Sequence, residues 1–289
     1  MTTRLDAHQH FWKYSPAEYG WIGDNMASLR RDFLPHDLQP LLAEQGFAGS
    51  IAVQARQSLE ETRWLLELAA HNDVVKGVVG WVDLRSPDLS AQLHQFAQNP
   101  SLVGVRHVVQ DEPDNDFMLG AEFRRGIARL GEYDLAYDIL IYPRQLPAAI
   151  KLVRDLPEQR FVLDHIAKPP IAEGRLNPWN RDLRELGKSE NVFCKLSGMV
   201  TEARWNDWKP QDFRPYLDVV LDTFTPARLM VGSDWPVCTA SASYRRTIAL
   251  VRDYIGALTS AEQDLILGEN CARFYRIREP NQPTLAGRA

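Results

Sequence analysis

Short apolar runs and longer amphipathic stretches alternate eight times along the 289 residues of this chain. Most of the apolar runs are nearly continuous, as expected for strands that are buried on both faces of a parallel sheet. We predict these strands at residues 3–9, 50–55, 75–82, 102–109, 135–141, 160–166, 191–197 and 228–234. The helices predicted to follow them lie at residues 35–46, 58–72, 86–99, 121–133, 143–156, 180–189, 213–224 and 243–255.

Such an alternation predicts an α/β protein that forms a single-domain (β/α)8 TIM barrel. A doubly wound open sheet is the alternative, but no G-x-G-x-x-G or P-loop motif follows any of the predicted strands. We expect the barrel to occupy residues 1–278, and residues 279–289, which contain two prolines, to form a flexible tail. Residues 11–34 form a long irregular loop after the first strand, which we predict to be a lid or, alternatively, to pack against the barrel rim.

Composition and charge exclude several classes of function. The formal net charge is -5 and the pI is about 5.8, so no basic surface is expected for nucleic acid or an anionic membrane. The three cysteines are far apart and form no C-x-x-C motif, which suits a reducing compartment. We find neither a signal peptide nor an apolar run long enough to span a bilayer, and therefore expect a cytoplasmic protein.

The first predicted strand ends in two histidines, His8 and His10, which are separated by one residue. Residues two apart on a strand point to the same face, so the two rings are expected to project together. Neutral imidazole is a good zinc ligand, but an H-x-H pair by itself fits a functional site and a polar strand end equally well.

Polar residues also collect where the other predicted strands end, and in a barrel these carboxyl ends form the active-site face. The positions hold Gln54, Arg56, Asp83, Arg106, His107, Asp138, Tyr142, Asp164, His165, Ser197, Asp234 and Trp235. Together with the first strand, the rim holds four of the seven histidines, which favours a functional site. Asp164 directly precedes His165, so strand alternation allows only one of the two to point inward, and we favour His165.

Six motifs follow one another between about residue 5 and about residue 275: DAHQHFW, RRDFLPHDL, VGVRH, LDHIAKP, KLSG and LMVGSDWPVC. In this combination the chain resembles the amidohydrolase-2 group of the amidohydrolase superfamily, and most closely its sugar-lactonase branch of L-fuconolactonases and L-rhamnonolactonases. The resemblance implies a (β/α)8 barrel and hydrolysis at a carbonyl carbon. It also implies that His8, His10 and Asp234 form the metal and water site, with His165 nearby.

Two departures from the superfamily pattern limit the metal site that the resemblance implies. The fourth predicted strand carries Arg106 and His107 where a binuclear site needs a bridging lysine or glutamate, and the fifth has no histidine. We therefore expect at most one divalent ion, zinc by preference, held weakly by His8, His10, Asp234 and His165. Some lactonases of this group are thought to work without a metal, so the need for the ion stays open, and the histidines either hold it or donate hydrogen bonds to the substrate.

The reaction expected from this resemblance is the opening of a sugar lactone, with L-fucono-1,4-lactone or a close stereochemical relative as substrate. Asp234 is expected to act as general base towards water and then, once protonated, as acid towards the ring oxygen. His8, His10 and His165, or a metal that they hold, are expected to stabilise the oxyanion. We assign positive charge and donors to Arg106, His107 and Lys168, hydroxyl recognition to Gln54, Arg56, Asp138 and Tyr142, and apolar walls to Trp12, Trp21, Met26 and Trp235.

Other functions remain open on sequence alone. The same barrel supports metal-dependent amidohydrolases and decarboxylases, as well as 2-pyrone-dicarboxylate-type lactonases. A non-catalytic sugar-binding barrel is disfavoured, because a pure binding protein has no need of an aspartate poised over a water molecule. The expected partner is a small sugar lactone, with no nucleic acid and no membrane. A homo-oligomer is compatible with the sequence but cannot be derived from it.

Overall fold

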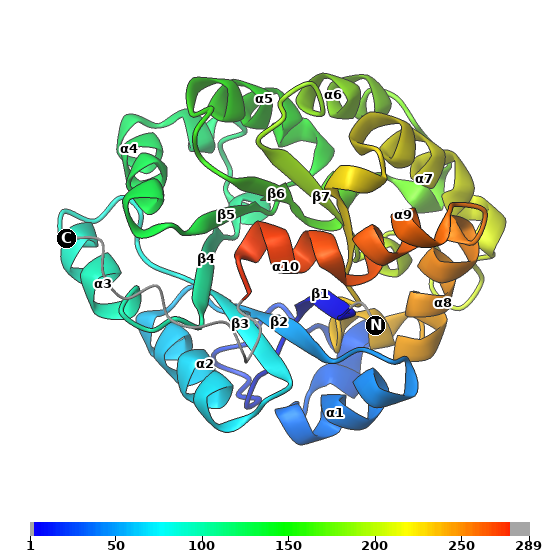
Figure 1. Cartoon of the computed structure of the whole chain (residues 1–289), viewed down its shortest axis with the longest axis horizontal. Helices are drawn as coiled ribbons and strands as arrows, with labels where there is room; N and C mark the ends of the chain where they lie inside the picture. Colours follow the sequence, from blue (N-terminus) through cyan, green and yellow to red (C-terminus); the bar gives the residue numbers. More distant parts are fainter. Residues whose placement is uncertain (1–2, 278–289) are drawn as a thin grey trace.

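The computed structural model describes residues 3–277, and within them eight parallel strands form one sheet in chain order (Figure 1). The strands are β1 (Leu5–Gln9), β2 (Gly49–Val53), β3 (Val75–Gly80), β4 (Leu102–His107), β5 (Ala136–Ile139), β6 (Phe161–Leu163), β7 (Val192–Leu196) and β8 (Leu229–Val231). All eight predicted strands are therefore confirmed, most of them a few residues shorter than the apolar runs.

The sheet closes into a barrel where the end of β8 meets β1. Gln9 forms a parallel bridge with Trp235, and the Asp234 N–H donates to the His8 carbonyl at 2.8 Å. A Cβ at Gly232 would lie 2.7 Å from the Cβ of His8, so the approach of the two chain segments requires a glycine here. The seam thereby brings the histidines of β1 beside the residues that follow β8.

A helix follows each strand within the described residues, and together these helices form the outer layer (Figure 1). They are α1 (Pro35–Glu44), α2 (Leu59–His71), α3 (Leu89–Phe96), α4 (Ala121–Leu130), α5 (Leu146–Asp155), α6 (Trp179–Leu186), α7 (Pro210–Phe224) and α8 (Tyr244–Ile255). At the start of α2, the Ser58 hydroxyl accepts the Glu61 N–H at 3.0 Å, which satisfies a backbone donor of the first turn. The Glu61 carboxylate turns the other way and accepts the backbone N–H groups of Ala55 and Arg56.

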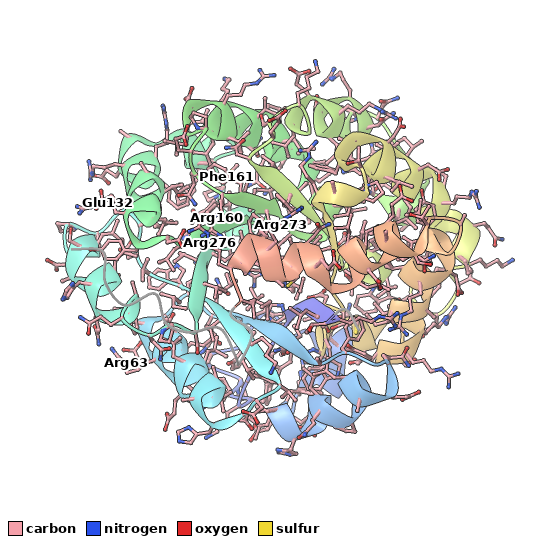
Figure 2. The ribbon with its side chains drawn as sticks, viewed as in Figure 1. Arg63, Glu132, Arg160, Phe161, Arg273 and Arg276 are labelled. Carbon is pink, nitrogen blue, oxygen red and sulfur yellow. The ribbon has the colours of Figure 1, made fainter. Side chains whose placement is uncertain are left out.

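The amino-terminal end of the barrel is covered by the chain that follows α8. A short helix, α9 (Ser260–Asp264), and a π-helical turn lead to α10 (Asn270–Tyr275), which crosses the centre of the ring in Figure 1. Phe274 and Tyr275 are buried against inward-facing residues of the strands. Arg160, labelled in Figure 2, donates to the Phe274 carbonyl and ties the helix to the start of β6. This end of the barrel is therefore sealed.

The long loop at residues 11–34 packs against the opposite end of the barrel. It contains a short 3-10 helix (Asp24–Leu29), and an antiparallel bridge joins Trp12 to Phe33. Tyr19 is buried together with these two rings, and all three belong to the apolar cluster that continues beneath the outer helices. The packing alternative is thus realised, and movement of the loop as a lid stays a prediction.

The fold prediction, a single-domain (β/α)8 barrel, is confirmed. Residues 279–289, expected to form a flexible tail, lie outside the described residues. Among residues 3–277, no helix combines the length and the apolar character that crossing a bilayer requires.

Candidate active site

A cavity of about 770 Å³ opens at the carboxyl ends of the strands, the face on which barrel enzymes carry their active sites. Nine of the predicted site residues line it: His10, Trp21, Met26, Arg56, Arg106, Tyr142, His165, Lys168 and Asp234. Sequence reasoning missed other lining residues, among them Glu18, Gln57, Gln110, Asp111, Glu112, Glu202 and Trp205. The lining mixes carboxylates, cations, amides and aromatic rings, which suits a small ligand with many hydroxyl groups.

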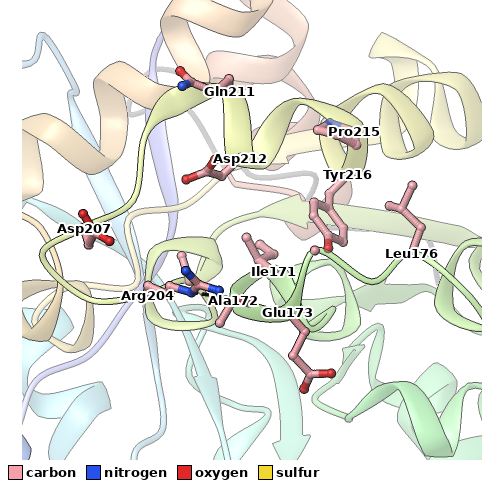
Figure 3. A pocket seen from close by; sticks show the side chains of 12 residues that line it. Ile171, Ala172, Glu173, Leu176, Arg204, Asp207, Gln211, Asp212, Pro215 and Tyr216 are labelled. Atoms are coloured by element: carbon pink, nitrogen blue, oxygen red, sulfur yellow. Dashed lines mark hydrogen bonds between the residues drawn. The ribbon is translucent and has the colours of Figure 1, made fainter.

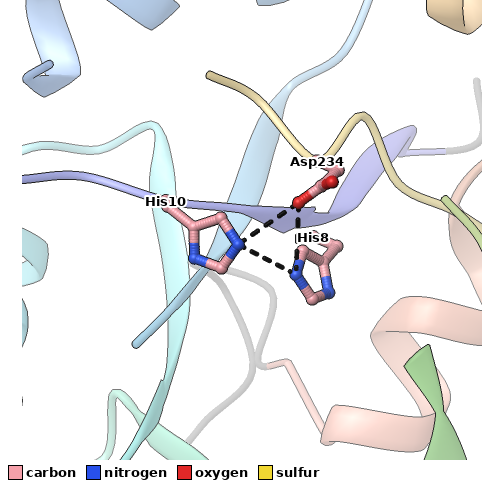
Figure 4. Close-up of side chains that lie close together, drawn as sticks. All are labelled: His8, His10 and Asp234. Carbon is pink, nitrogen blue, oxygen red and sulfur yellow. Dashed lines mark hydrogen bonds and ion pairs between the residues drawn. The ribbon is translucent and has the colours of Figure 1, made fainter. Parts of the chain in front are cut away.

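The floor of the cavity is built at the barrel seam (Figure 4). His8 Nε2 lies 3.2 Å from His10 Nε2, and Asp234 Oδ1 lies 3.3 Å from His10 Nε2 and 3.8 Å from His8 Nε2. His8 is fully buried beneath the floor and does not line the cavity. It therefore acts on a substrate only through its neighbours or through a metal ion that it shares with them.

The outer nitrogen of His10 fixes the tautomer of this ring. His10 Nδ1 lies 2.8 Å from the Val53 carbonyl, which can only accept, so the proton of the neutral ring is on Nδ1. His10 Nε2 is the ring nitrogen that faces His8 and Asp234. This is the usual arrangement of an imidazole that binds a metal or accepts a proton.

His165 enters the site through an unusual stretch of backbone. β6 ends at Leu163, and φ lies between +48° and +58° at all four residues from His165 to Lys168, which form one turn of left-handed helix. The Lys168 N–H bonds to the His165 carbonyl three residues earlier, so the two side chains share a face, and both line the cavity. The Trp179 indole holds the turn by donating to the Ile166 carbonyl at 2.7 Å.

Because the chain leaves strand geometry at this point, the prediction that only one of Asp164 and His165 points inward is wrong. Asp164 Oδ2 accepts from Arg106 Nη1 at 3.0 Å, and Asp164 Oδ1 lies 3.0 Å from the Lys195 ammonium. His165 Nδ1 lies 2.8 Å from the Ser197 hydroxyl. Both side chains therefore belong to the interior of the barrel, one below the floor and one on it.

A layer of charges that sequence reasoning missed lies beneath the floor. Lys195 is fully buried, and its ammonium lies 2.5 Å from Asp138 Oδ2 and 3.2 Å from His8 Nδ1. Tyr275 of α10 donates to the same Asp138 oxygen at 2.7 Å. Asp138, predicted to bind substrate hydroxyls, is thus engaged inside the barrel and does not line the cavity. The available signal was a lysine within the otherwise apolar run VFCKL.

Burial and neighbouring charges shift the pKa values of the buried carboxyl and imidazole groups in opposite directions. Burial by itself raises the pKa of the Asp234 carboxyl, but the imidazole rings around it, His165 first, outweigh burial and hold the pKa below its ordinary value. Burial also opposes ionisation of Asp164, but the cations beneath the floor, Lys195 first, hold its pKa well below the ordinary value. Burial lowers the pKa of His165 to about 4, so this ring is neutral at pH 7. Asp234 is therefore an ionised carboxylate that faces the cavity.

Arg106 brings a positive charge to the floor. Its Nη1 lies 3.3 Å from His8 Nε2, and its Nη2 donates to the backbone carbonyl and the side-chain oxygen of Gln54. Gln54, predicted to bind hydroxyl groups, is fully buried and does not line the cavity. Its amide donates to the Arg106 carbonyl at 3.3 Å, so the structure pairs Gln54 with Arg106 beneath the cavity.

Two ion pairs stand on the walls of the cavity. Arg56 pairs with Glu18 of the long loop and lies 3.7 Å from Glu61 Oε1, so this contact joins the loop to the rim after β2. Lys168 lies 4.0 Å from Glu202 Oε1, on the segment that follows β7. Burial raises the pKa of Glu202, and Lys168 partly offsets this effect.

Three predicted residues face away from the cavity. The His107 ring stacks on Phe117 with a centroid distance of 5.1 Å, because alternation along β4 turns it outward. Trp12 and Trp235 both pack edge-on against Phe33, with centroids 5.3 Å apart in each case. None of the three lines the cavity, so the structure does not bring them together with the other predicted site residues.

A second hollow, of about 410 Å³, lies between residues 171–176 and residues 203–216 (Figure 3). Glu173, Arg204 and Asp207 are among its lining residues, and none of the described lining residues is a histidine. The groups suited to chemistry therefore gather in the larger cavity.

The floor of that cavity fits one metal ion. Among the described residues, His8, His10 and Asp234 form one group of ligand atoms within 4.8 Å of one another, and a second group contains His8, Asp164 and His165. Tetrahedral zinc, with bonds of about 2.0–2.2 Å, separates its ligand atoms by roughly 3.4 Å, close to the 3.2 and 3.3 Å found around His10. Asp164 is already paired with two cations, so the first group is the better donor set.

Comparison with known proteins agrees with this geometry. The family model described as Amidohydrolase matches residues 5–277. The chain belongs to the amidohydrolase family. Two relatives of this amidohydrolase, both named L-fucono-1,5-lactonase, are similar over nearly their whole length. The protein from Burkholderia multivorans is 44% identical over 288 residues, covering 96% of this chain and 97% of the relative. The protein from Burkholderia ambifaria is 39% identical over 294 residues, covering 97% and 98%.

Solved structures agree on the fold. A crystal structure of an amidohydrolase from Burkholderia multivorans with bound zinc matches this amidohydrolase with a TM-score of 0.92 at 44% identity, over 96% of this chain and 100% of that chain. A putative 2-pyrone-4,6-dicarboxylic acid hydrolase from Pseudomonas putida matches with a TM-score of 0.75 at 20% identity, over 96% and 99%. The second likeness shows a shared fold alone.

Proposed function

We propose that this amidohydrolase hydrolyses the ring ester of a sugar lactone, with L-fuconolactone as its best substrate. The observation that carries the proposal is the Asp234 carboxylate, which is ionised, lies between His10 and His165, and faces a cavity with polar walls. The two relatives named L-fucono-1,5-lactonase support the substrate class.

Asp234 is placed to activate water. Its Oδ1 lies 3.3 Å from His10 Nε2 and 3.9 Å from His165 Nε2, and the group is ionised and can act as a general base. The carboxylate takes a proton from a water molecule whose oxygen attacks the carbonyl carbon of the lactone. The carbonyl electron pair moves to its oxygen, which becomes the oxyanion of a tetrahedral intermediate.

Positive charge on the cavity lining stabilises this oxyanion. Arg106 and Lys168 both line the cavity. Positive groups stabilise a developing negative charge more strongly where water is excluded than in bulk water. As the intermediate collapses, the bond to the ring oxygen breaks and Asp234 returns its proton to that oxygen. The product is an open-chain hydroxy acid, which ionises by releasing a proton to solvent. A zinc ion held by His8, His10 and Asp234 would supply Lewis-acid polarisation of the carbonyl group.

The cavity walls support a substrate with several hydroxyl groups. Glu202, Gln110 and Tyr142 offer acceptors and donors, while Trp21 and Met26 offer apolar surface for a sugar ring face. Sequence motifs led us to expect the five-membered 1,4-lactone, whereas the relatives are named for the six-membered 1,5-lactone. We propose that the enzyme acts on L-fuconolactone in both ring sizes and prefers the 1,5-lactone.

We also propose a cytoplasmic location and a small-molecule partner. Cys194, Cys238 and Cys271 are all buried as free thiols, which suits a reducing compartment. Nucleic acid and membrane partners are not part of the proposal, in keeping with the net charge of -5.

The test is a comparison of kcat/KM across the 1,5- and 1,4-lactones of L-fuconic acid, L-rhamnono-, D-arabinono- and γ-butyrolactone, followed with a pH indicator. A site built to pair hydroxyl groups rejects an analogue that lacks them by as much as 10⁴–10⁵-fold, because its own polar groups stay unpaired. We therefore expect γ-butyrolactone to be a very poor substrate.

A dicarboxylated pyrone lactone and a simple amide serve as controls for the alternative functions. Efficient turnover of the pyrone, the amide or the bare lactone, at a rate equal to that of the best sugar lactone, would show that the proposal is wrong.

A further inference from the structure

The two ion pairs on the walls of the cavity differ in how closely their charges meet. Arg56 and Glu18, the closed pair, are joined by a direct hydrogen bond. In the open pair, Lys168 Nζ and Glu202 Oε1 lie 4.0 Å apart, which is longer than a hydrogen bond. Within residues 3–277, neither the Lys168 ammonium nor the Glu202 carboxylate forms a side-chain hydrogen bond. The open pair therefore keeps donors and an acceptor for a ligand.

Both charges of the open pair are held on the wall and still reach the cavity. The side chains of Lys168 and Glu202 are 17% and 22% exposed. The Lys168 ammonium lies 5.5 Å from the centroid of the Tyr142 ring, within the range of a cation–π contact. Glu202 is fixed through its backbone, since its N–H donates to the Met199 carbonyl and its own carbonyl accepts the Ala172 N–H. A polar group of a ligand can thus approach two charges that are already in place.

A hydroxyl group matches the open pair. Its oxygen accepts a hydrogen bond from an ammonium, and its hydrogen is donated to a carboxylate. With bonds of about 2.7–2.9 Å on each side, one oxygen atom can bridge Lys168 and Glu202 across their separation of 4.0 Å. A methylene group in the same place cannot replace the hydrogen bonds that water makes with the two charges, and this loss lowers affinity. The open pair therefore discriminates a hydroxyl group from a hydrogen atom.

The open pair lies beside the groups assigned to the reaction. Lys168 follows His165 by three residues on the left-handed turn, and their side chains share a face. His165 Nε2 lies 3.9 Å from Asp234 Oδ1, which is assigned to water activation. Burial raises the pKa of Glu202, and the charge of Asp234 adds to this rise, so the two carboxyl groups are within electrostatic reach of each other. A hydroxyl group bound by the open pair therefore belongs to a carbon atom close to the lactone carbonyl.

We propose that Lys168 and Glu202 are specificity-determining residues that bind the 2-hydroxyl group of the substrate, so that the enzyme selects 2-hydroxy lactones. In such a lactone the hydroxyl and carbonyl oxygens are on adjacent carbon atoms, and both can lie within reach of one ammonium. Lys168 has three N–H donors and serves the hydroxyl group and the developing oxyanion together, while Glu202 accepts the hydroxyl hydrogen. The inference rests on the proposed lactone hydrolysis and names the part of the substrate that the site recognises.

The decisive experiment compares kcat/KM for α-hydroxy-γ-butyrolactone, β-hydroxy-γ-butyrolactone and unsubstituted γ-butyrolactone, with each enantiomer assayed separately. A hydrogen bond to a charged group changes affinity by about 10–150-fold, so the wild type should prefer one enantiomer of the α-hydroxy lactone to the bare lactone by about this factor. The β-hydroxy lactone should gain less. A larger gain from the β-hydroxyl than from the α-hydroxyl would show that the assignment to the 2-hydroxyl group is wrong.

Variants of Glu202 test whether the open pair causes this preference. Glu202→Met keeps the length of the side chain, removes the carboxylate and leaves Lys168 in place, so the preference for the α-hydroxy lactone should fall by about 10-fold or more. Glu202→Gln keeps an acceptor and should retain part of the preference. The matched control, Glu18→Met, removes the carboxylate of the closed pair and should keep the wild-type preference. An unchanged preference in Glu202→Met, or equal losses in both methionine variants, would overturn the proposal.

Binding of ring analogues that resist hydrolysis separates this inference from the reaction itself. 3-Hydroxy-2-pyrrolidinone and 2-pyrrolidinone carry an amide in place of the ester, and their binding to the full-length protein is followed by NMR titration. We expect the wild type to bind the hydroxylated lactam about 10-fold more tightly or better, and Glu202→Met to lose this difference. Equal binding of the two lactams by the wild type would refute the inference. A protein that prefers the hydroxylated lactam but hydrolyses no lactone would refute the proposed function alone.

Discussion

The floor of the cavity and the charged layer beneath it use the same residue types, but the shortest contacts of their carboxylates differ in length. In the lower layer, Asp138 Oδ2 accepts from Lys195 at 2.5 Å and from Tyr275 at 2.7 Å. On the floor, the imidazole nitrogens nearest to Asp234 Oδ1 lie 3.3 to 3.9 Å away. The difference teaches that burial alone does not mark a reactive group: the carboxylate with the looser contacts is the one that faces the cavity and keeps capacity for water.

The largest expected effect comes from the floor. Asp234→Asn keeps the size and polarity of the side chain but removes its basicity, so turnover of the best lactone should fall by about 10²–10⁴-fold. The melting temperature is measured alongside, so that a loss of stability is separated from the loss of basicity. A variant that keeps most of its kcat with native stability would remove Asp234 from the mechanism.

Substitutions in the lower charged layer should lower the free energy of unfolding. Lys195→Met leaves Asp138 and Asp164 without their shared cation, and the loss of one partner from a buried ion pair costs about 3–5 kcal/mol of unfolding free energy. Urea unfolding measures this loss. The double variant Lys195→Met/Asp138→Asn should recover part of it, and a double variant that is less stable than Lys195→Met would contradict this account of the layer.

The rim supplies a further buried carboxyl, Glu61, whose partners are mainly backbone amides. Burial raises the pKa of Glu61 to about 7 from its ordinary value of 4.5, although the N–H groups and the charge of Arg56 act against the rise. The folded state therefore binds this proton more tightly than the unfolded state. The resulting stabilisation, about 3 kcal/mol, is fully present below about pH 4.5 and is lost as the pH rises through 7.

The measurement is urea unfolding of the wild type and of Glu61→Gln at pH 5 and pH 8. The wild type should lose more stability than the variant between these two pH values. Asp164 should contribute the opposite pH dependence of stability. Cations hold its pKa well below the ordinary value, so the stabilisation that it contributes is lost only as the pH falls into the acid range. Equal losses in the wild type and Glu61→Gln would assign the pH dependence to other groups.

The smallest expected effect belongs to a histidine of the rim that faces away from the cavity. His107→Gln removes a contact of 2.7 Å with Glu112 and the stacking on Phe117, at a cost of about 1 kcal/mol in stability. Because His107 does not line the cavity, kcat/KM for the best lactone should stay unchanged. A large fall in kcat/KM would show that His107 contributes to substrate binding or catalysis.

The barrel could be predicted because most strands are nearly continuous apolar runs, and such runs alternating with amphipathic helices leave few possible architectures. The seam residues could also be predicted, since His8, His10 and Asp234 lie at the ends of the first and last strands. Strand alternation failed at Asp164 and His165, because four residues in succession adopt a left-handed conformation there without a glycine to signal it.

Sequence also does not tell how deep an inward-facing residue lies. Asp138 does point inward from β5, but whether it meets a substrate or a partner from below depends on Tyr275, which is 137 residues away in the chain. Lys195 was missed for the same reason: its partners come from β5 and from the turn after β6, and a lysine in a buried strand is explained only when those partners are known.

The position of α10 has a consequence for the order in which the protein is completed as it is synthesised. The chain leaves the ribosome from its amino terminus, and segments fold as they become available. Strand β1 carries His8, yet its partner across the seam is not made until residues near Asp234 emerge, and Tyr275 emerges later still. Until then the nascent barrel is open at both its seam and its base, and water reaches the charges of its interior. The active site is therefore among the last parts of the protein to be assembled, although its first histidine is among the first residues to be translated.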